Sequence, residues 1–145
     1  MNNHIILIIE VTLSIFICWQ FREKIKVVII DAIRQVQLKN YLSGKERRQL
    51  AELRNNNNNM LIDHSNDGLL KDAYRCLSQA TINRKKNKIT IIVPTMNYPE
   101  IQEYIQAKLD QHLLRWLEGN YPGHHWTKPT LKKKLFGWEY ILTEK

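Results

Sequence analysis

The chain opens with a nearly unbroken apolar run, and later segments carry apolar residues at helical or strand spacing. The opening run, IILIIEVTLSIFICW, covers residues 5–19 and contains Glu10 as its one formal charge. At about 1.5 Å per residue it extends roughly 22 Å, close to what a bilayer requires. The pattern predicts a membrane anchor over residues 1–21, with Trp19 at the membrane interface.

Basic residues follow this run, and none precedes it. Arg22, Lys24 and Lys26 lie just after it, whereas the first four residues include no Lys or Arg. The positive-inside rule then predicts a single-pass, N-out/C-in protein with its C-terminal bulk in the cytoplasm. A buried or interfacial helix is the alternative. A cleaved secretory signal fits less well because its basic residues should come before the apolar run.

Residues 22–54 show the periodicity of a basic amphipathic stalk. Ile25, Ile29, Ile33 and Val36 recur at spacings of three or four and predict an association stripe along one helix. This stripe packs on the rest of the chain, lies along a membrane surface, or pairs with a second copy in a homo-oligomer. The sequence SGKE at residues 43–46 matches a capping box and predicts that a second helix begins there.

Five consecutive asparagines at residues 55–59 interrupt the helical pattern. Asparagine side chains compete with the backbone for hydrogen bonds, so residues 55–68 are predicted to be a linker. The remainder, residues 69–145, is predicted to be a small basic α+β domain. The chain as a whole is therefore expected to be α+β, with a transmembrane helix and stalk helices followed by a helix–strand–helix–strand domain.

Within that domain the pattern of apolar residues predicts each element in turn. Helical spacing is expected to end near residue 81, and a basic loop at residues 84–88 leads into the β-branched strand ITIIV at 89–93, closed by Pro94. An amphipathic helix follows over residues 97–119, and alternation at residues 136–143 predicts a final strand with an aromatic face. Two strands make a thin sheet, so residues 125–127 or another chain are expected to add a third.

Composition excludes several kinds of chemistry. The two cysteines, Cys18 and Cys76, lie in segments of different character and indicate neither a disulfide framework nor a zinc site. His124 and His125 are adjacent, a spacing that does not suit a shared metal ion. No nucleophile elbow or phosphate loop is present. The sequence therefore predicts a protein that is not an enzyme and needs no cofactor or metal.

The formal net charge of +8 comes partly from two basic clusters, each of which precedes a predicted strand. If those strands were parallel, the clusters would meet at one end of the sheet and bind DNA or an anionic surface through phosphate contacts. Charge that serves only solubility is the alternative for either cluster. The predicted binding residues are Arg84, Lys85, Lys86, Lys88, Lys132, Lys133 and Lys134.

Three C-terminal motifs carry a resemblance to a known family. The segments ITIIVP, LLRWLEGNYPGHHW and LFGWEYILTEK resemble the membrane-proximal α+β segment of FtsK/SpoIIIE-like DNA translocases and conjugative coupling proteins of Gram-positive bacteria. The similarity covers about residues 72–145. The chain ends where the ATPase domain of that family would begin, so no nucleotide-binding residue can be assigned. The resemblance implies a bacterial accessory protein of a DNA-transfer complex.

Together these patterns predict a membrane-anchored adaptor that faces the cytoplasm and binds without catalysis. Its expected partners are the membrane, DNA through the basic residues, and a protein of a membrane complex. The alternative is a membrane-surface subunit that binds proteins or anionic lipid and has no role with nucleic acid. Salt-dependent DNA binding would favour the first interpretation, and binding only to anionic vesicles would favour the second.

Overall fold

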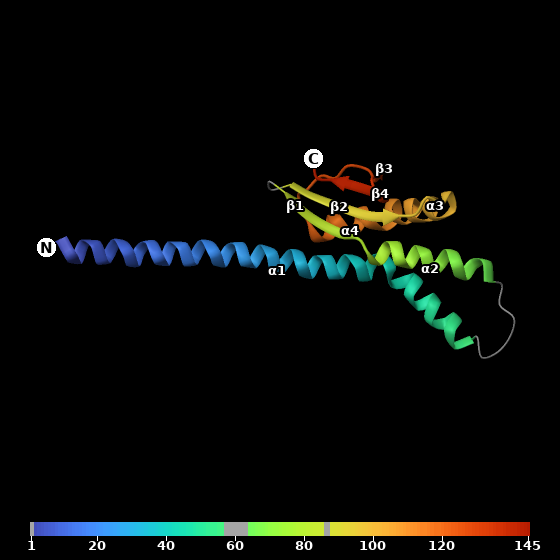
Figure 1. Ribbon diagram of the computed structural model, residues 1–145, viewed down its shortest axis with the longest axis horizontal. Helices are drawn as coiled ribbons and strands as arrows, with labels where there is room; N and C mark the ends of the chain where they lie inside the picture. The colour runs from blue at the N-terminus through green and yellow to red at the C-terminus, as the bar shows by residue number, and fades with distance from the viewer. Residues whose placement is uncertain (1, 57–63, 86–87) are drawn as a thin grey trace. The chain divides into compact units, whose positions relative to one another are not determined.

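The computed structural model describes residues 2–56, 64–85 and 88–145, with side chains described for 11–54, 68–85 and 88–145. The elements in chain order are α1 (Asn2–Asn56), α2 (His64–Ser78), β1 (Thr81–Lys85), β2 (Lys88–Thr95), α3 (Pro99–Lys108), the π-helical segment η1 (Leu109–Leu113), α4 (Leu114–Asn120), β3 (Thr130–Lys134) and β4 (Gly137–Thr143) (Figure 1). The chain divides into two compact units, residues 1–33 and 34–145. The class is α+β, as predicted.

Two predictions about the N-terminal part of the chain, which forms helix α1, are wrong. Among the residues that the structure describes, no helix has an apolar stretch long enough to cross a membrane. The expected single-pass anchor and its N-out/C-in localisation are therefore wrong. The apolar run of residues 5–19 falls short of the ~20 residues that a span needs, and charged residues follow from Arg22 onward.

The helix also continues through the predicted capping box. Ser43 Oγ donates to the main-chain oxygen of Lys39, 2.7 Å away, which is the bond a serine makes inside a helix rather than at its start. Helix α1 ends at Asn56, and α2 begins at His64, inside the range that was expected to be linker. Most of the asparagine run, residues 57–59, lies outside the described residues.

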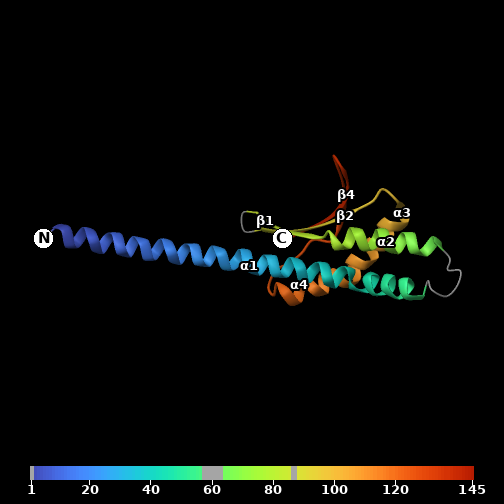
Figure 2. The same cartoon turned by 60° about the horizontal axis from the view of Figure 1, so that its bottom comes forward.

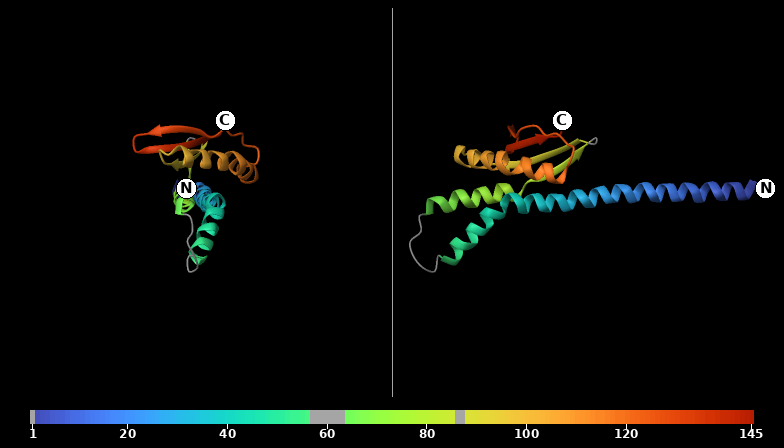
Figure 3. Two further views of the ribbon diagram at one scale, coloured as in Figure 1. Left: turned by 90° about the vertical axis from the view of Figure 1, so that its right-hand side faces the viewer. Right: turned by 180° about the vertical axis from the view of Figure 1, so that it is seen from behind.

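Residues 34–145 form a layer of strands with helices on one side of it (Figure 3). The sheet is antiparallel with strand order β1-β2-β4-β3. Strands β1, β2 and β4 are labelled in Figure 2. Strand β2 and the second half of β4 alternate between a buried and a more exposed side chain, as Ile91 and Ile92 illustrate. Antiparallel sheets commonly bury one face and leave the other in water. Strand β2 accordingly buries Ile89, Ile91 and Val93, whereas Thr90 and Ile92 are half-exposed.

Two strands were not anticipated. Strand β1 follows directly after α2, where a loop had been expected, and β3 contains the three consecutive lysines. The expected third strand at residues 125–127 is reduced to a single bridge between Trp126 and Glu144. Strand β2 also passes through Pro94 instead of ending there. Because β1 begins opposite Ile92, one edge of β2 lacks a partner beyond that residue, and proline is tolerated at such an edge.

The core lies between the helices and the inner face of the sheet. Leu38 and Leu42 of α1, Ile105 of α3 and Leu142 of β4 are fully buried within it. Helix α3 starts after Tyr98 with proline at its first turn, close to the predicted start, but no side chain caps it. From Pro99 to Asn120 the helical segments α3, η1 and α4 follow one another without a break and bury the predicted apolar stripe.

Candidate binding surfaces

The outer face of the sheet carries basic side chains at both of its ends. Residues paired across antiparallel strands share a face. The register pairs Lys85 with Lys88 at one end, and Pro94 with Glu139 and Glu139 with Lys132 towards the other. Between these ends the same face carries half-exposed threonine and isoleucine side chains.

The hairpin of β1 and β2 brings the first basic cluster to one end of the sheet. Lys85 and Lys88 are cross-strand partners at the hairpin turn and lie on the outer face. Arg84 pairs with Ile89 and lies on the inner face, where its charge acts on Glu144. Lys86 lies outside the described residues. We call Arg84, Lys85 and Lys88 the β1–β2 tip.

The hairpin of β3 and β4 carries the second cluster together with two exposed apolar side chains. Lys132 and Lys134 lie on the outer face, and Lys134 Nζ is 3.2 Å from Glu139 Oε1. Lys133 lies on the other face, 5.9 Å from the centre of the Trp138 ring. At the turn, Leu135 and Phe136 are 88% and 96% exposed. We call residues 132–136 the β3–β4 tip.

The antiparallel topology separates the two tips. Strand β2 begins at Lys88, beside the first tip, and ends at Thr95, which pairs with Trp138 beside the second. Its eight residues place the two ends roughly 23 Å apart at about 3.3 Å per residue. The prediction that both clusters form one patch required parallel strands. The structure instead makes two patches at opposite ends of one sheet.

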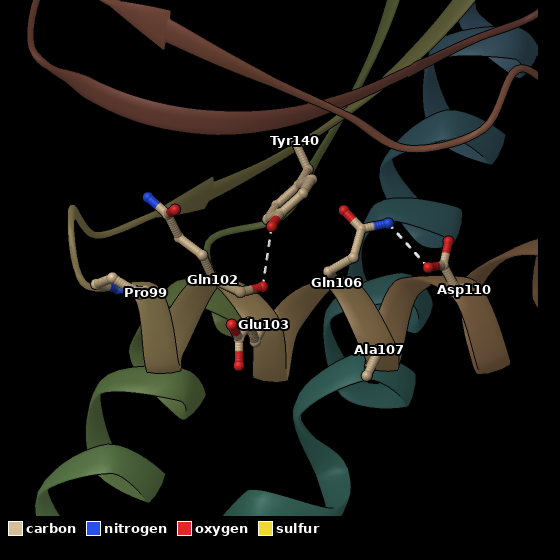
Figure 4. A pocket seen from close by; sticks show the side chains of 7 residues that line it. All are labelled: Pro99, Gln102, Glu103, Gln106, Ala107, Asp110 and Tyr140. Atoms are coloured by element: carbon tan, nitrogen blue, oxygen red, sulfur yellow. Dashed lines mark hydrogen bonds between the residues drawn. The ribbon is translucent and has the colours of Figure 1, made fainter.

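The predicted aromatic face divides between two environments. Tyr140 is buried in the core at 3% exposure, so it serves as a packing residue. Its hydroxyl donates to the main-chain oxygen of Gln102, 2.9 Å away (Figure 4). Phe136 is the exception, because it extends into solvent at the turn. A fully exposed phenylalanine beside lysines is available for stacking against a base.

A polar pocket of about 450 Å³ lies where α3 and η1 meet Tyr140 (Figure 4). Several of its polar groups form hydrogen bonds. Gln106 Nε2 donates to Asp110 Oδ2 at 2.9 Å, and Gln102 Nε2 donates to the main-chain oxygen of Met96 at the same distance. Burial and the charge of Asp110 raise the pKa of the Tyr140 hydroxyl, which keeps it a donor. The residues that line this pocket include no serine, cysteine, lysine or histidine.

The two adjacent histidines have different surroundings. His124 Nδ1 lies 2.6 Å from Glu144 Oε1, and the other carboxylate oxygen accepts from the Ile89 amide at 3.1 Å. His125 is exposed, while its main-chain oxygen accepts from the Lys145 amide. In the part of the chain that the structure describes, no cluster of histidine, cysteine and carboxylate side chains could hold a metal ion. Glu144 instead joins His124 to the start of β2.

The residues assigned to a membrane interface and to an association stripe all lie on α1. Trp19 is exposed, as are the flanking cations, and Lys26 Nζ bonds Glu23 Oε1 at 2.8 Å. The stripe side chains are each more than half exposed; they are Ile25, Ile29, Ile33 and Val36. The proposed self-association through this stripe remains a prediction.

A buried ion pair escaped the sequence analysis. Glu46 is 0% exposed, and its Oε1 accepts from Lys108 Nζ and from Tyr104 Oη, the latter at 2.7 Å. Burial and this hydrogen bond raise the pKa of the Tyr104 hydroxyl. The signal was present in the sequence, because Glu46 continues the four-residue spacing of the buried Leu38 and Leu42. Its match to a capping box concealed that position.

Comparison with known proteins finds no matching family, no curated relative and no similar solved structure. The resemblance to DNA translocases and coupling proteins therefore remains a prediction from the sequence.

Proposed function

We propose that residues 34–145 form a non-enzymatic nucleic-acid-binding module, and that a strand of nucleic acid crosses the outer face of the sheet from one hairpin tip to the other. The observation that carries this proposal is the placement of lysines at both ends of an uncovered face. Phosphates at these ends would meet Lys85 and Lys88 on one side and Lys132 and Lys134 on the other. Between the two tips an extended ligand would lie over half-exposed threonine and isoleucine side chains.

Contacts of this kind confer affinity without sequence reading. Each phosphate neutralised by a lysine or arginine releases condensed counterions, so affinity falls as salt rises. Lys134 already pairs with Glu139, so Lys132 is the more available of the two lysines for a phosphate contact at that end. Phe136 adds a stacking surface that only unpaired bases can use. The module is therefore expected to prefer single strands to duplexes.

The test compares salt dependence among three triple variants of the full chain. Lys132→Gln/Lys133→Gln/Lys134→Gln should flatten the slope of log affinity against log salt by about 1.4–1.8 units, which is 0.7–0.9 for each of the two outer-face lysines. Arg84→Gln/Lys85→Gln/Lys88→Gln should flatten it by a similar amount if one ligand reaches both tips. The matched control changes three exposed basic residues of the helices, Lys71, Arg75 and Arg115, to Gln and should leave the slope unchanged.

Changing Phe136 to Ala tests the stacking contact separately. Single-strand affinity should fall by about 1–3 kcal/mol, whereas duplex affinity should stay the same. If neither single-stranded nor duplex nucleic acid binds the full chain at low salt, the proposal is wrong. Equal slopes for all three triple variants would show that the tips are not the contact. Binding to anionic vesicles but not to nucleic acid would favour the lipid-binding alternative.

A further inference from the structure

We infer that a second site, in the helical part of residues 34–145, binds a small phosphorylated molecule. A pocket of about 340 Å³ lies between the C-terminal half of α1 and the α3–η1 junction. The residues that line it are Asn40, Tyr41, Gly44, Lys45, Arg48, Lys108 and His112. This volume falls within the range of roughly 300–1,000 Å³ found for small-molecule sites.

The lining is cationic and includes no carboxylate. Lys45 and Arg48 are three residues apart on one helix, so both reach the same face, and His112 approaches from η1 on the other side. Lys108 also lines the pocket, but Glu46 already holds its ammonium group. The groups that can meet an anion are therefore Lys45, Arg48 and His112. Arginine and lysine with an imidazole suit the several oxygens of a phosphate.

The local geometry leaves the side chains that line this pocket accessible to a ligand. Arg48 Nε donates to the main-chain oxygen of Gly44 at 3.2 Å, which folds the side chain over its own helix and leaves the end of the guanidinium available. Gly44 forms part of the lining, and a Cβ built there meets no atom within 4 Å. Tyr41 and His112 form a T-shaped ring contact, with centroids 6.3 Å apart. A π-helical turn beside the pocket is also a feature often found at functional sites.

The ligand is a phosphate ester or pyrophosphate rather than a polymer. The pocket lies among the helices, whereas the proposed nucleic-acid surface lies on the outer face of the sheet. Tyr41 and Asn40 also line the pocket and would contact the organic group of a phosphate ester. The site therefore stands on observations separate from those that support the nucleic-acid surface.

The experiment measures binding of pyrophosphate and of inorganic phosphate to the full chain by calorimetry. Arg48→Gln should weaken pyrophosphate binding by about tenfold or more, since a charge-assisted contact is lost. The matched control, Arg47→Gln, changes the same charge at the neighbouring exposed position, which does not line the pocket, and should retain binding. Gly44→Leu should abolish binding by filling the pocket, while Gly44→Ala should retain it. Both substitutions also favour the helix.

Absence of saturable binding in the wild type would overturn the inference. Equal loss in the Arg47 and Arg48 variants would do the same, because it would indicate general charge attraction. Citrate binding as tightly as pyrophosphate would overturn the assignment to phosphate. The variant Lys132→Gln/Lys133→Gln/Lys134→Gln should bind pyrophosphate as the wild type does, which separates this site from the nucleic-acid surface.

Discussion

Glu46 and Lys108 form a buried ion pair that ties α1 to α3. Taking charges out of water is costly, and removing one partner leaves the other uncompensated. Lys108→Met should therefore lower the free energy of unfolding by about 3–5 kcal/mol. The double variant Glu46→Leu/Lys108→Met should lose less than the single one, because no buried charge remains. Urea denaturation measures both, and a cost below about 1 kcal/mol for Lys108→Met would contradict the pair.

Glu144 makes the free energy of unfolding depend on pH in the acid range. Burial alone would raise its pKa, but hydrogen bonds from His124 and the Ile89 amide, with the charges of His124 and Arg84, lower the pKa of this carboxyl overall. A carboxyl with a lowered folded-state pKa stabilises the fold above its unfolded value of about 4.3, and this stabilisation disappears as pH falls through the folded value. Glu144→Gln should therefore flatten the acid side of the stability profile. Glu118→Gln, at an exposed site of α4, serves as the control and should leave the profile unchanged.

Among the helices and strands, α1 carries the feature that most clearly calls for a partner. Burial of its exposed association stripe against a second copy would stabilise the pair by about 1.5–3 kcal/mol per side chain. Ile29→Asp should then reduce crosslinking of the full chain. Ile30→Asp adds the same charge at the next exposed residue, away from the stripe, and should have less effect. Similar losses in both variants would contradict pairing along this face.

Cys18 offers a direct readout of the same association. It is exposed and lies seven residues before Ile25, a heptad away on the same face, whereas Cys76 is buried. In a parallel pair the two copies of Cys18 would face each other, so mild oxidation should give a covalent dimer. Cys18→Ser should abolish that dimer. A monomer under all these conditions would leave the stripe without a role in self-association.

At the level of the whole molecule, the antiparallel sheet decides what the basic residues can do. A parallel arrangement would have concentrated their charge at one end, whereas the observed register divides it between two hairpin tips. A ligand that uses both tips must be extended over roughly 23 Å. Short oligonucleotides that cannot cover this distance should therefore show the salt slope of one tip alone. A slope independent of oligonucleotide length would contradict binding across the face.

The local pattern of the sequence determined the elements with strong periodicity. The apolar stripe from Ile101 to Leu117 predicted a helix because burial of one face requires that spacing, and the β-branched residues before Pro94 predicted a strand. Short strands such as β1 and β3 escaped detection. Their polar sequences, TINRK and TLKKK, have no clear alternation, and only pairing with β2 and β4 makes them strands.

Tertiary structure decided the rest, because strand pairing and helix packing depend on residues distant in the sequence. The sequence sets which positions carry basic charge, but strand direction and register set whether those positions lie close together. Likewise, Glu46 matches a local capping signal, yet its burial against Lys108, 62 residues away, overrides that signal. The pocket at Arg48 and His112 also exists only where two distant helices come together. Sequence thus determined the class α+β and the charges, while packing determined the surfaces on which those charges act.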